Sequence, residues 1–368
     1  MSDVERIHVV VGDASYDIVI GEGILESCGK LVAEVTTAKR VSLITDTKVR
    51  ELYGPKVSAY LASAGFEVHA LSVAPGEASK SWEVAGQLLE AMSRDGIERG
   101  DVVVALGGGV VGDLAGFAAA TYLRGIEFVQ IPTTLLGQVD SSIGGKTGVD
   151  LSAGKNLAGA FKQPLLVLSD TAVLSTLPQE EWQSGLAEVA KSAVISGDEF
   201  LEWLERNAEA IVARDPKVSA EMVLRCATFK SGVIMADERE ADVRECLNFG
   251  HTLGHAIENV AGYGAYSHGL AVAEGMRFAS RLAVEGAHAS REFVARQDAL
   301  LDSLELPAIE QRYEPDEIAR ALHSDKKVRG GVTRWVLADG PGMWRCQAVE
   351  DSMIMEHLEA WAASKGGE

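Results

Sequence analysis

Short runs of β-branched residues alternate with helix-length stretches through the first half of the chain. We expect strands at 41–46, 68–73, 101–106, 127–132 and 165–170. Alternating apolar residues at 7–11 and 17–20 predict an antiparallel hairpin at the edge of the same domain. Strands separated by helix-sized intervals are typical of a mostly parallel sheet with helices on both faces. The first half is therefore predicted to be an α/β domain.

The pattern changes after position 170. From about 179 to 323 the chain has helical periodicity, capping residues and almost no β-branched runs. Two further runs, 333–337 and 344–349, predict a small hairpin before a final helix. We expect two domains, an α/β domain at 1–178 and an all-α domain at 179–368.

Charge and cysteine usage restrict the possible partners. The 368 residues contain 34 Lys and Arg against 54 Asp and Glu, giving a formal charge of −20. Such a field repels nucleic acid and anionic lipid, so neither is expected as a partner. The acidic residues at 1–6 do not resemble a signal peptide, and no apolar run is long enough for a membrane span. Four widely spaced cysteines indicate reduced thiols in a cytoplasmic protein.

A glycine-rich turn follows the third expected parallel strand. Gly107, Gly109 and Gly112 satisfy G-x-G-x-x-G between a strand and a helix, where backbone N–H groups can hold a pyrophosphate. Asp46 ends an earlier strand and could accept a ribose hydroxyl. The turn lies about a hundred residues into the chain, which indicates a variant of the Rossmann arrangement. A tight turn without a ligand remains the alternative.

The stretch 132–148, which follows the next strand, is rich in Gly, Ser and Thr and is interpreted as a loop. Its hydroxyls, backbone amides and Lys146 suit phosphate or ribose contacts. A flexible loop without a ligand is the alternative.

Three of the eight histidines lie within eighteen residues. His251 and His255 share one helix face with Glu258, and His268 follows. Spacing alone proposes His251, His255 and either Glu258 or His268 as ligands of a divalent metal. Thr252 stands where a zinc protease needs glutamate, which disfavours peptide hydrolysis. Histidines with a purely structural role are the alternative.

Together these blocks resemble the 3-dehydroquinate synthase family over nearly the whole chain. The resemblance is carried by the order and spacing of 76–80, 107–113, 124–125, 132–148, 155–156, 186–191, 248–258, 268–269 and 325–327.

The resemblance implies a Rossmann-like parallel-sheet domain followed by a helical metal-binding domain. It implies one Zn²⁺ or Co²⁺ held by Glu188, His251 and His268, with His255 as a nearby polar group and not a ligand. It implies that NAD contacts the set Asp46, Gly76, Glu77, Lys80, Gly109, Val110, Val111, Gly112, Asp113, Thr133, Thr134, Asp140, Lys146, Lys155 and Thr176. It implies that the catalytic and substrate-binding set is Arg124, Lys146, Asn156, Lys191, Lys230, Arg244, Asn248, His255 and Lys326.

The family's reaction starts from a sugar phosphate, 3-deoxy-D-arabino-heptulosonate 7-phosphate. The resemblance implies transient oxidation by NAD, β-elimination of phosphate, re-reduction and intramolecular aldol closure, in a homodimer. Three alternatives stay open: a cyclase acting on another substrate such as sedoheptulose 7-phosphate, a metal- and NAD-dependent polyol dehydrogenase, and a nucleotide-sensing module without catalysis.

Overall fold

The computed structural model describes residues 4–240, 242–262, 264–286, 288–324, 328–329 and 332–366, so the predicted substrate residue Lys326 lies outside the described residues. The chain forms two compact units. The first contains the chain up to Leu177 together with Ser219–Glu238, and the second contains Pro178–Val218 and the chain from Arg239 onward.

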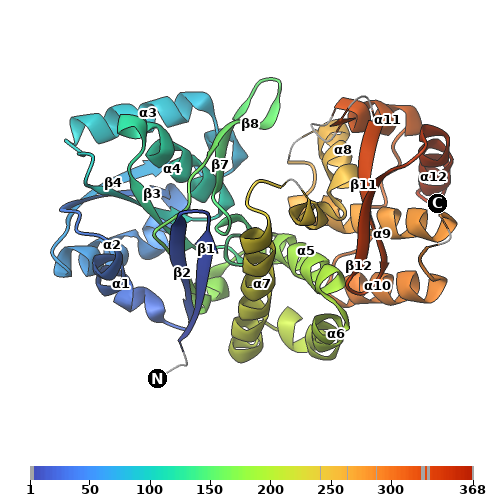
Figure 1. The fold of residues 1–368 in the computed structure, drawn as a ribbon, viewed down its shortest axis with the longest axis horizontal. Helices are drawn as coiled ribbons and strands as arrows, with labels where there is room; N and C mark the ends of the chain where they lie inside the picture. Colours follow the sequence, from blue (N-terminus) through green and yellow to red (C-terminus); the bar gives the residue numbers. More distant parts are fainter. Residues whose placement is uncertain are drawn as a thin grey trace. The chain divides into compact units, whose positions relative to one another are not determined.

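A seven-stranded sheet forms the centre of the first unit (Figure 1). Its spatial order is β1-β2-β9-β6-β5-β3-β4, and every neighbouring pair is parallel except β1 with β2. The strands are β1 (Glu5–Val11), β2 (Ala14–Gly21), β3 (Arg40–Asp46), β4 (Glu67–Val73), β5 (Val102–Gly107), β6 (Glu127–Pro132) and β9 (Leu166–Asp170). The predicted strands and the predicted edge hairpin are confirmed.

Alternating side chains of β5 explain why the sheet is covered on both faces. Val102 and Val104 belong to a core with helices α1 (Cys28–Val35) and α2 (Thr47–Ser63). Val103 belongs to a second core with α3 (Trp82–Arg94) and α4 (Gly109–Thr121). A strand buried on both faces has no polar positions, which is why β5 reads as an unbroken apolar run.

The loop expected at 132–148 is only partly a loop. A single π-helical turn, η4, spans Gly137–Ser141, and strand β7 (Lys146–Leu151) pairs antiparallel with β8 (Gly154–Phe161). Figure 1 shows this hairpin projecting from the unit. The expectation was wrong because the hairpin is rich in glycine and alanine, which strand propensity disfavours. Its two backbones approach closely, and a Cβ on Gly159 would lie 2.5 Å from the carbonyl oxygen of Thr147.

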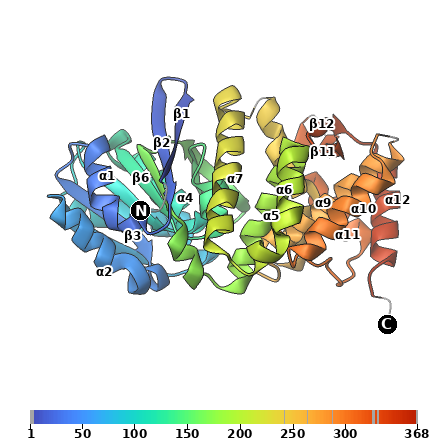
Figure 2. The same ribbon diagram turned by 90° about the horizontal axis from the view of Figure 1, so that it is seen from below.

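Helix α7 (Pro216–Ala236) lies beside the β1–β2 hairpin in both views (Figures 1 and 2). The contacts of Ser219–Glu238 place this segment with the first unit, although it lies in the stretch expected from sequence to belong to the helical domain. Gln163 donates to the Glu238 carboxylate at 3.2 Å, which ties the end of the segment to the sheet unit.

The second unit is mostly helical and is built around α9 (His268–Glu285), which contacts α5, α8, α10, α12 and β11. The remaining helices are α5 (Gln179–Ser196), α6 (Asp198–Val212), α8 (His251–Ala261), α10 (Arg291–Ser303), α11 (Pro315–Ser324) and α12 (Asp351–Ala363). A short strand, β10 (Val328–Arg329), precedes the hairpin β11 (Val332–Gly340) and β12 (Met343–Ala348), so the predicted hairpin and final helix are confirmed.

Short helical turns join these elements: η1 (Ile24–Ser27), η2 (Glu77–Ser79), η3 (Tyr122–Arg124), η5 (Thr171–Thr176) and η6 (Val243–Asn248). Within the described part of the chain, none of the helices has the length and apolar character that a bilayer-crossing segment requires.

Candidate active site

A buried carboxylate on α5 is the starting point of the helical unit's polar cluster. Glu188 is 1% exposed, and Lys191, one turn later, is 2% exposed. The ammonium of Lys191 forms an ion pair with Oε2 of Glu188. Oε1 is buried and accepts no hydrogen bond from the described residues. Burying an ionised carboxylate is costly unless a cation or a donor faces it, so Oε1 has the environment of a ligand atom.

Two histidines face that same oxygen. Nε2 of His251 lies 3.4 Å from Oε1 of Glu188, and Nε2 of His268 lies 3.7 Å from it. The Nδ1 atoms of both rings have other partners: His251 donates to the Phe249 carbonyl at 3.1 Å, and His268 pairs with Oε2 of Glu258 at 3.1 Å. These partners leave the Nε2 lone pairs directed at one point beside Glu188. One carboxylate and two imidazoles are a donor set that suits Zn²⁺ or Co²⁺.

Among the described residues, two groups have ligand atoms within 4.8 Å of one another. The first is Glu188, His251 and His268, and the second is His255, Glu258 and His268. Neither combines His251 with His255, which spacing alone had grouped. His255 lies close by, with its ring centroid 5.4 Å from that of His251 and 5.9 Å from that of His268.

Glycine contacts set the separation of the helices that carry these ligands. Gly269 follows His268 and packs against α5, where a Cβ would lie 2.4 Å from Cα of Ser184, one turn before Glu188. The N–H of Gly269 also donates to the Ser184 hydroxyl at 3.2 Å. A side chain at position 269 would move His268 away from Glu188, so this glycine is required for the cluster.

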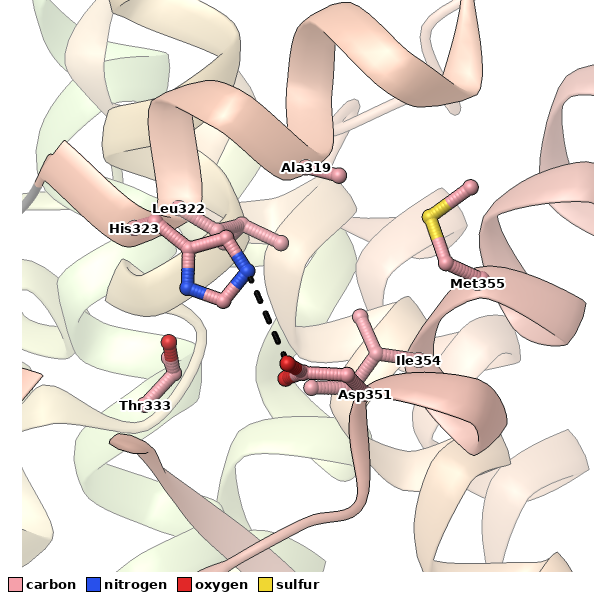
Figure 3. A pocket seen from close by; sticks show the side chains of 7 residues that line it. All are labelled: Ala319, Leu322, His323, Thr333, Asp351, Ile354 and Met355. Atoms are coloured by element: carbon pink, nitrogen blue, oxygen red, sulfur yellow. Dashed lines mark ion pairs between the residues drawn. The ribbon is translucent and has the colours of Figure 1, made fainter. Parts of the chain in front are cut away.

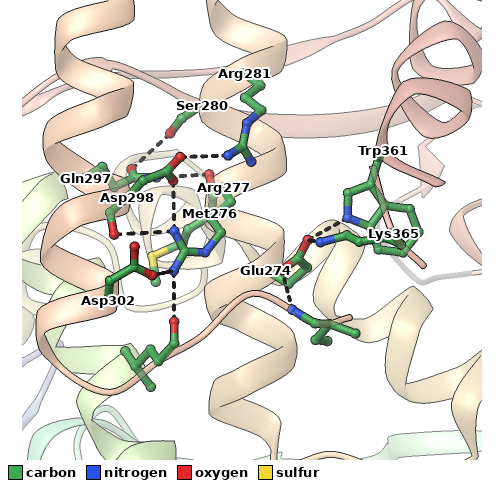
Figure 4. A network of polar contacts seen from close by, with 12 residues as sticks. Glu274, Met276, Arg277, Ser280, Arg281, Gln297, Asp298, Asp302, Trp361 and Lys365 are labelled. Carbon is green, nitrogen blue, oxygen red and sulfur yellow. Dashed lines mark hydrogen bonds and ion pairs between the residues drawn. The ribbon is translucent and has the colours of Figure 1, made fainter. Parts of the chain in front are cut away.

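Helix α9 is anchored further along by a network of polar contacts (Figure 4). Both oxygens of Glu274 are used: Oε1 accepts from Trp361 Nε1 at 2.5 Å and from Lys365 Nζ at 2.6 Å, and Oε2 accepts from the N–H of Ile309 at 2.9 Å. Arg277, one turn later, pairs with Asp298 and Asp302 of α10. These contacts fix the helix that begins with His268.

The other predicted substrate residues of this unit lie on η6 or next to the cluster. Arg244 is 2% exposed, and the amide of Asn248 donates to Glu240 at 2.5 Å. Lys191 is part of the cluster through its ion pair with Glu188.

In the sheet unit, the glycine-rich turn joins β5 directly to α4. Gly108 is the N-cap of α4 and has no side chain with which to cap it. A Cβ on Gly108 would lie 2.8 Å from Thr134, and one on Gly109 would lie 2.9 Å from the Ser141 hydroxyl. Because the N-cap residue has no side chain, the first-turn N–H groups, which include those of Val110 and Val111, can receive an external anion. Gly112 allows Gln130 to approach.

Thr133 supplies an unsatisfied polar atom beside the turn. Its N–H donates to Gly107 at 2.9 Å, while its hydroxyl is buried and has no hydrogen-bond partner among the described residues. Thr134 is already used, since its hydroxyl accepts from the N–H of Gly137 at 3.0 Å. An uncapped helix start and an orphaned hydroxyl fit the phosphate and ribose groups of a dinucleotide.

A partly buried ion pair involves the helix that follows the same turn. Lys80 Nζ is 2.6 Å from Asp113 Oδ2, and Lys155 Nζ is 3.9 Å from Glu77 Oε1. Burial by itself would lower the pKa of Lys80, but attraction to Asp113 and Glu77 exceeds it and raises the pKa. Gly76, with φ of 96°, precedes this group.

Asp46 has a structural partner that the sequence did not show. Its Oδ1 accepts from the N–H groups of Lys48 at 2.8 Å and Val49 at 3.0 Å, which makes Asp46 the N-cap of α2.

Lys230 and Asp140, which sequence assigned to different ligands, form a pair. Nζ of Lys230 lies 2.7 Å from both the carboxylate and the carbonyl oxygen of Asp140. Lys230 is 6% exposed. It lies on α7, ninety positions after Asp140 in the chain.

Not all predicted residues of this unit gather. Lys146 lies opposite Phe161 in the strand register, at one end of the β7–β8 hairpin. Asn156 lies near the turn at the other end, with φ of 55°. Arg124 ends η3 with φ of 68° and is exposed. The hydroxyl of Thr176 interacts with that of Tyr53 at 2.8 Å.

Comparisons with known proteins agree with this arrangement. The sequence profile of the 3-dehydroquinate synthase N-terminal domain matches residues 70–184, and that of the C-terminal domain matches residues 185–328. The chain is 47% identical to the 3-dehydroquinate synthase of Pelobacter propionicus, over 91% of this chain and 93% of the relative. The chain belongs to the 3-dehydroquinate synthase family.

Solved structures of related cyclases have the same fold. A 2-deoxy-scyllo-inosose synthase complexed with carbaglucose-6-phosphate, NAD⁺ and Co²⁺ superposes with a TM-score of 0.90, at 28% identity over 97% of this chain and 100% of the other. The 2-epi-5-epi-valiolone synthase ValA from Streptomyces hygroscopicus, with NAD⁺ and Zn²⁺ bound, gives 0.87 at 30% identity over 96% and 98%. The predicted fold class, an α/β unit with a helical unit, is confirmed.

A further pocket is present in the helical unit (Figure 3). It is lined from α11, β11 and α12, and His323 faces Asp351 across it at 3.9 Å. Its seven described lining residues include none of the predicted site residues, and most are apolar.

Sequence reasoning missed three contributions to the site: the carboxylate of Glu258 on His268, the ion pair of Lys191 with Glu188, and the close approach at Gly269. The i,i+3 spacing of Glu188 and Lys191 on one helix was visible in the sequence. The other two depend on contacts between helices, for which the sequence holds no local signal.

Proposed function

We propose that the protein is a 3-dehydroquinate synthase that converts 3-deoxy-D-arabino-heptulosonate 7-phosphate to 3-dehydroquinate and phosphate, with no net oxidation or reduction. The observation that carries this proposal is Glu188, which buries a carboxylate oxygen facing two imidazole nitrogens in a chain of this family. This donor set supports the assignment of Glu188, His251 and His268 as ligands of Zn²⁺ or Co²⁺.

When bound, NAD⁺ would supply a reversible hydride acceptor, and the divalent ion would lower the pKa of the hydroxyl that is oxidised. Lys191 holds Glu188 in one orientation through Oε2, which leaves Oε1 for the ion. His255 lies beside the ligand histidines but does not belong to the group of ligand atoms around Glu188, so we assign it to proton transfer. An imidazole both donates and accepts protons near neutral pH.

We assign NAD to the glycine-rich turn. The uncapped start of α4 would hold the pyrophosphate, and the orphaned Thr133 hydroxyl would take one further hydrogen bond. The Lys80–Asp113 pair ties the start of α4, just after the turn, to Lys80. The remaining predicted contacts of NAD are proposed on the family resemblance.

We assign the substrate's phosphate and carboxylate to the buried or partly buried cations. Lys230 is held in place by Asp140, and Arg244 is almost fully buried. Both side chains are therefore already ordered and lose little conformational entropy when they bind an anion. These two side chains would provide local positive charge in a chain whose total charge is −20. Asn156, Asn248, Lys146 and Arg124 are proposed as further substrate contacts.

The test is an assay of phosphate release from 3-deoxy-D-arabino-heptulosonate 7-phosphate with NAD⁺ and Zn²⁺ or Co²⁺. We expect phosphate to appear while NADH does not accumulate. Stoichiometric NADH would contradict the proposal and support a polyol dehydrogenase. A parallel reaction with sedoheptulose 7-phosphate is expected to be much slower; preference for that substrate would identify a different cyclase.

We also propose a cytoplasmic homodimer. Leu151, Leu157 and Phe161 of the β7–β8 hairpin are 40% or more exposed, as an interface between copies would require. The four cysteines are all free thiols, which suits a reducing compartment. Light scattering of the purified protein should give twice the mass of the chain, and a monomer at micromolar concentration would contradict the dimer.

A further inference from the structure

One carboxylate lies next to the proposed metal ligands without belonging to the ligand set. Glu258 is on α8, two turns after His251, and is 7% exposed. Its Oε2 lies 3.1 Å from Nδ1 of His268, which begins the following helix. A carboxylate so deeply buried is costly unless it serves an interaction.

We propose that Glu258 is a positioning residue that fixes the ring and tautomer of His268 for metal binding. The inference rests on the proposed function, because it assigns the partner of a ligand in that metal site. An ionised carboxylate can only accept a hydrogen bond, so the contact places the proton of His268 on Nδ1. The lone pair of Nε2 then points toward Oε1 of Glu188.

The two ligand histidines are supported differently. His251 donates Nδ1–H to a neutral acceptor, the carbonyl of Phe249, which belongs to its own chain segment. His268 donates to a charged acceptor on another helix. A carboxylate partner makes the imidazole a stronger electron donor than a carbonyl partner does. His268 should therefore depend more on its partner than His251 does.

The alternative role for Glu258 is that of a direct ligand. With His255 and His268 it forms the second group of ligand atoms within 4.8 Å. If His268 bound that ion through Nδ1, it would have to give up its hydrogen bond to Glu258. The 3.1 Å contact of Nδ1 with Glu258, together with the approach of Nε2 to Glu188, favours the positioning role.

The experiment compares Co²⁺ binding by the metal-free full-length wild type, Glu258→Ala and Glu258→Gln, by chelator competition and by visible absorption. Glu285→Gln is the matched control, since Glu285 lies at the end of α9 and faces an imidazole outside the cluster, that of His357, at 3.5 Å. Unfolding of each metal-free variant checks its fold.

We expect Glu258→Ala to weaken Co²⁺ binding by about 10- to 100-fold and to alter the cobalt spectrum. Glu258→Gln should weaken binding by about tenfold or less, because its amide oxygen still accepts from Nδ1–H. Glu285→Gln should match the wild type. A loss of Co²⁺ affinity that is largest in Glu258→Ala and intermediate in Glu258→Gln would show that the hydrogen bond to His268, and not side-chain packing, is responsible.

Unchanged cobalt affinity and spectrum in Glu258→Ala would overturn the inference. In another outcome, the wild type binds two equivalents of Co²⁺, of which Glu258→Ala loses only the second. That result would overturn the inference and identify Glu258 as a direct metal ligand. Binding is measured without NAD⁺ or sugar phosphate, so these results are independent of the phosphate-release assay. Cobalt binding with the expected ranking but no phosphate release would leave the inference intact and contradict the proposed function.

Discussion

Gly275 of α9 lies directly against the carbonyl oxygen of Gly250, and a Cβ on Gly275 would lie 1.8 Å from that oxygen. Gly250 immediately precedes His251, so this contact sets the position of a proposed metal ligand. Gly275→Ala should push α8 and α9 apart, destabilise the protein by about 2 kcal/mol or more and weaken metal binding.

Denaturant unfolding and cobalt titration check this prediction. Gly86→Ala in α3 is the control, because nothing lies within 4 Å of its Cβ, and it should stabilise the protein by up to about 1 kcal/mol. Equal effects of the two substitutions would show that the α8–α9 contact does not matter.

Replacing Glu188, His251 or His268 by Ala should abolish retention of the metal. His255→Ala should retain the metal and slow turnover by about 100-fold or more, since its proposed role is proton transfer. Metal analysis after gel filtration, together with phosphate-release rates, separates the two effects. Metal loss in His255→Ala would instead support the ligand set built on helix spacing, and retention in His268→Ala would then select Glu258 as its third member.

Lys191→Met should destabilise the metal-free protein by about 3 kcal/mol, because it leaves the buried Glu188 carboxylate without a cation. A bound divalent ion supplies positive charge at the same carboxylate. Adding Zn²⁺ should therefore raise the melting temperature of Lys191→Met more than that of the wild type. Calorimetry with and without metal measures this, and equal shifts would speak against a metal at Glu188.

Asp46 can be tested for its two roles separately. Asp46→Ala should cost about 1 kcal/mol through loss of the α2 cap, whereas Asp46→Asn should keep the cap. If the carboxylate also accepts a ribose hydroxyl, both variants should weaken NAD binding in calorimetric titration. NAD affinity equal to that of the wild type in Asp46→Asn would restrict Asp46 to its structural role.

The Lys80–Asp113 pair predicts an alkaline pH dependence of stability. Asp113 and Glu77 raise the pKa of Lys80 in the folded protein above its usual 10.5. The stability that comes from this charge is therefore present in full below pH 10.5 and is lost as pH rises through the higher folded-state pKa. The difference in unfolding free energy between wild type and Lys80→Gln should shrink over that range, and a constant difference would contradict the prediction.

The parallel sheet could be predicted because β5 and its neighbours are buried on both faces and read as apolar runs. The β7–β8 hairpin could not, because its strands are stabilised by backbone approach at Gly148 and Gly159 and not by β-branched side chains. Similarly, the spacing of His251 and His255 placed both on one helix face, but only tertiary packing brings Glu188 and His268 to His251.

The anchoring of Glu274 by Lys365 has a consequence for how the protein is handled in the laboratory. These two residues are 91 positions apart, and Glu274 lies on the helix that begins with His268. Trimming the chain before Trp361 would remove two of the three donors to this carboxylate, which lies only six residues after His268 on that helix. Fusion tags and domain junctions placed at the C-terminal helix would therefore disturb the helix that carries His268.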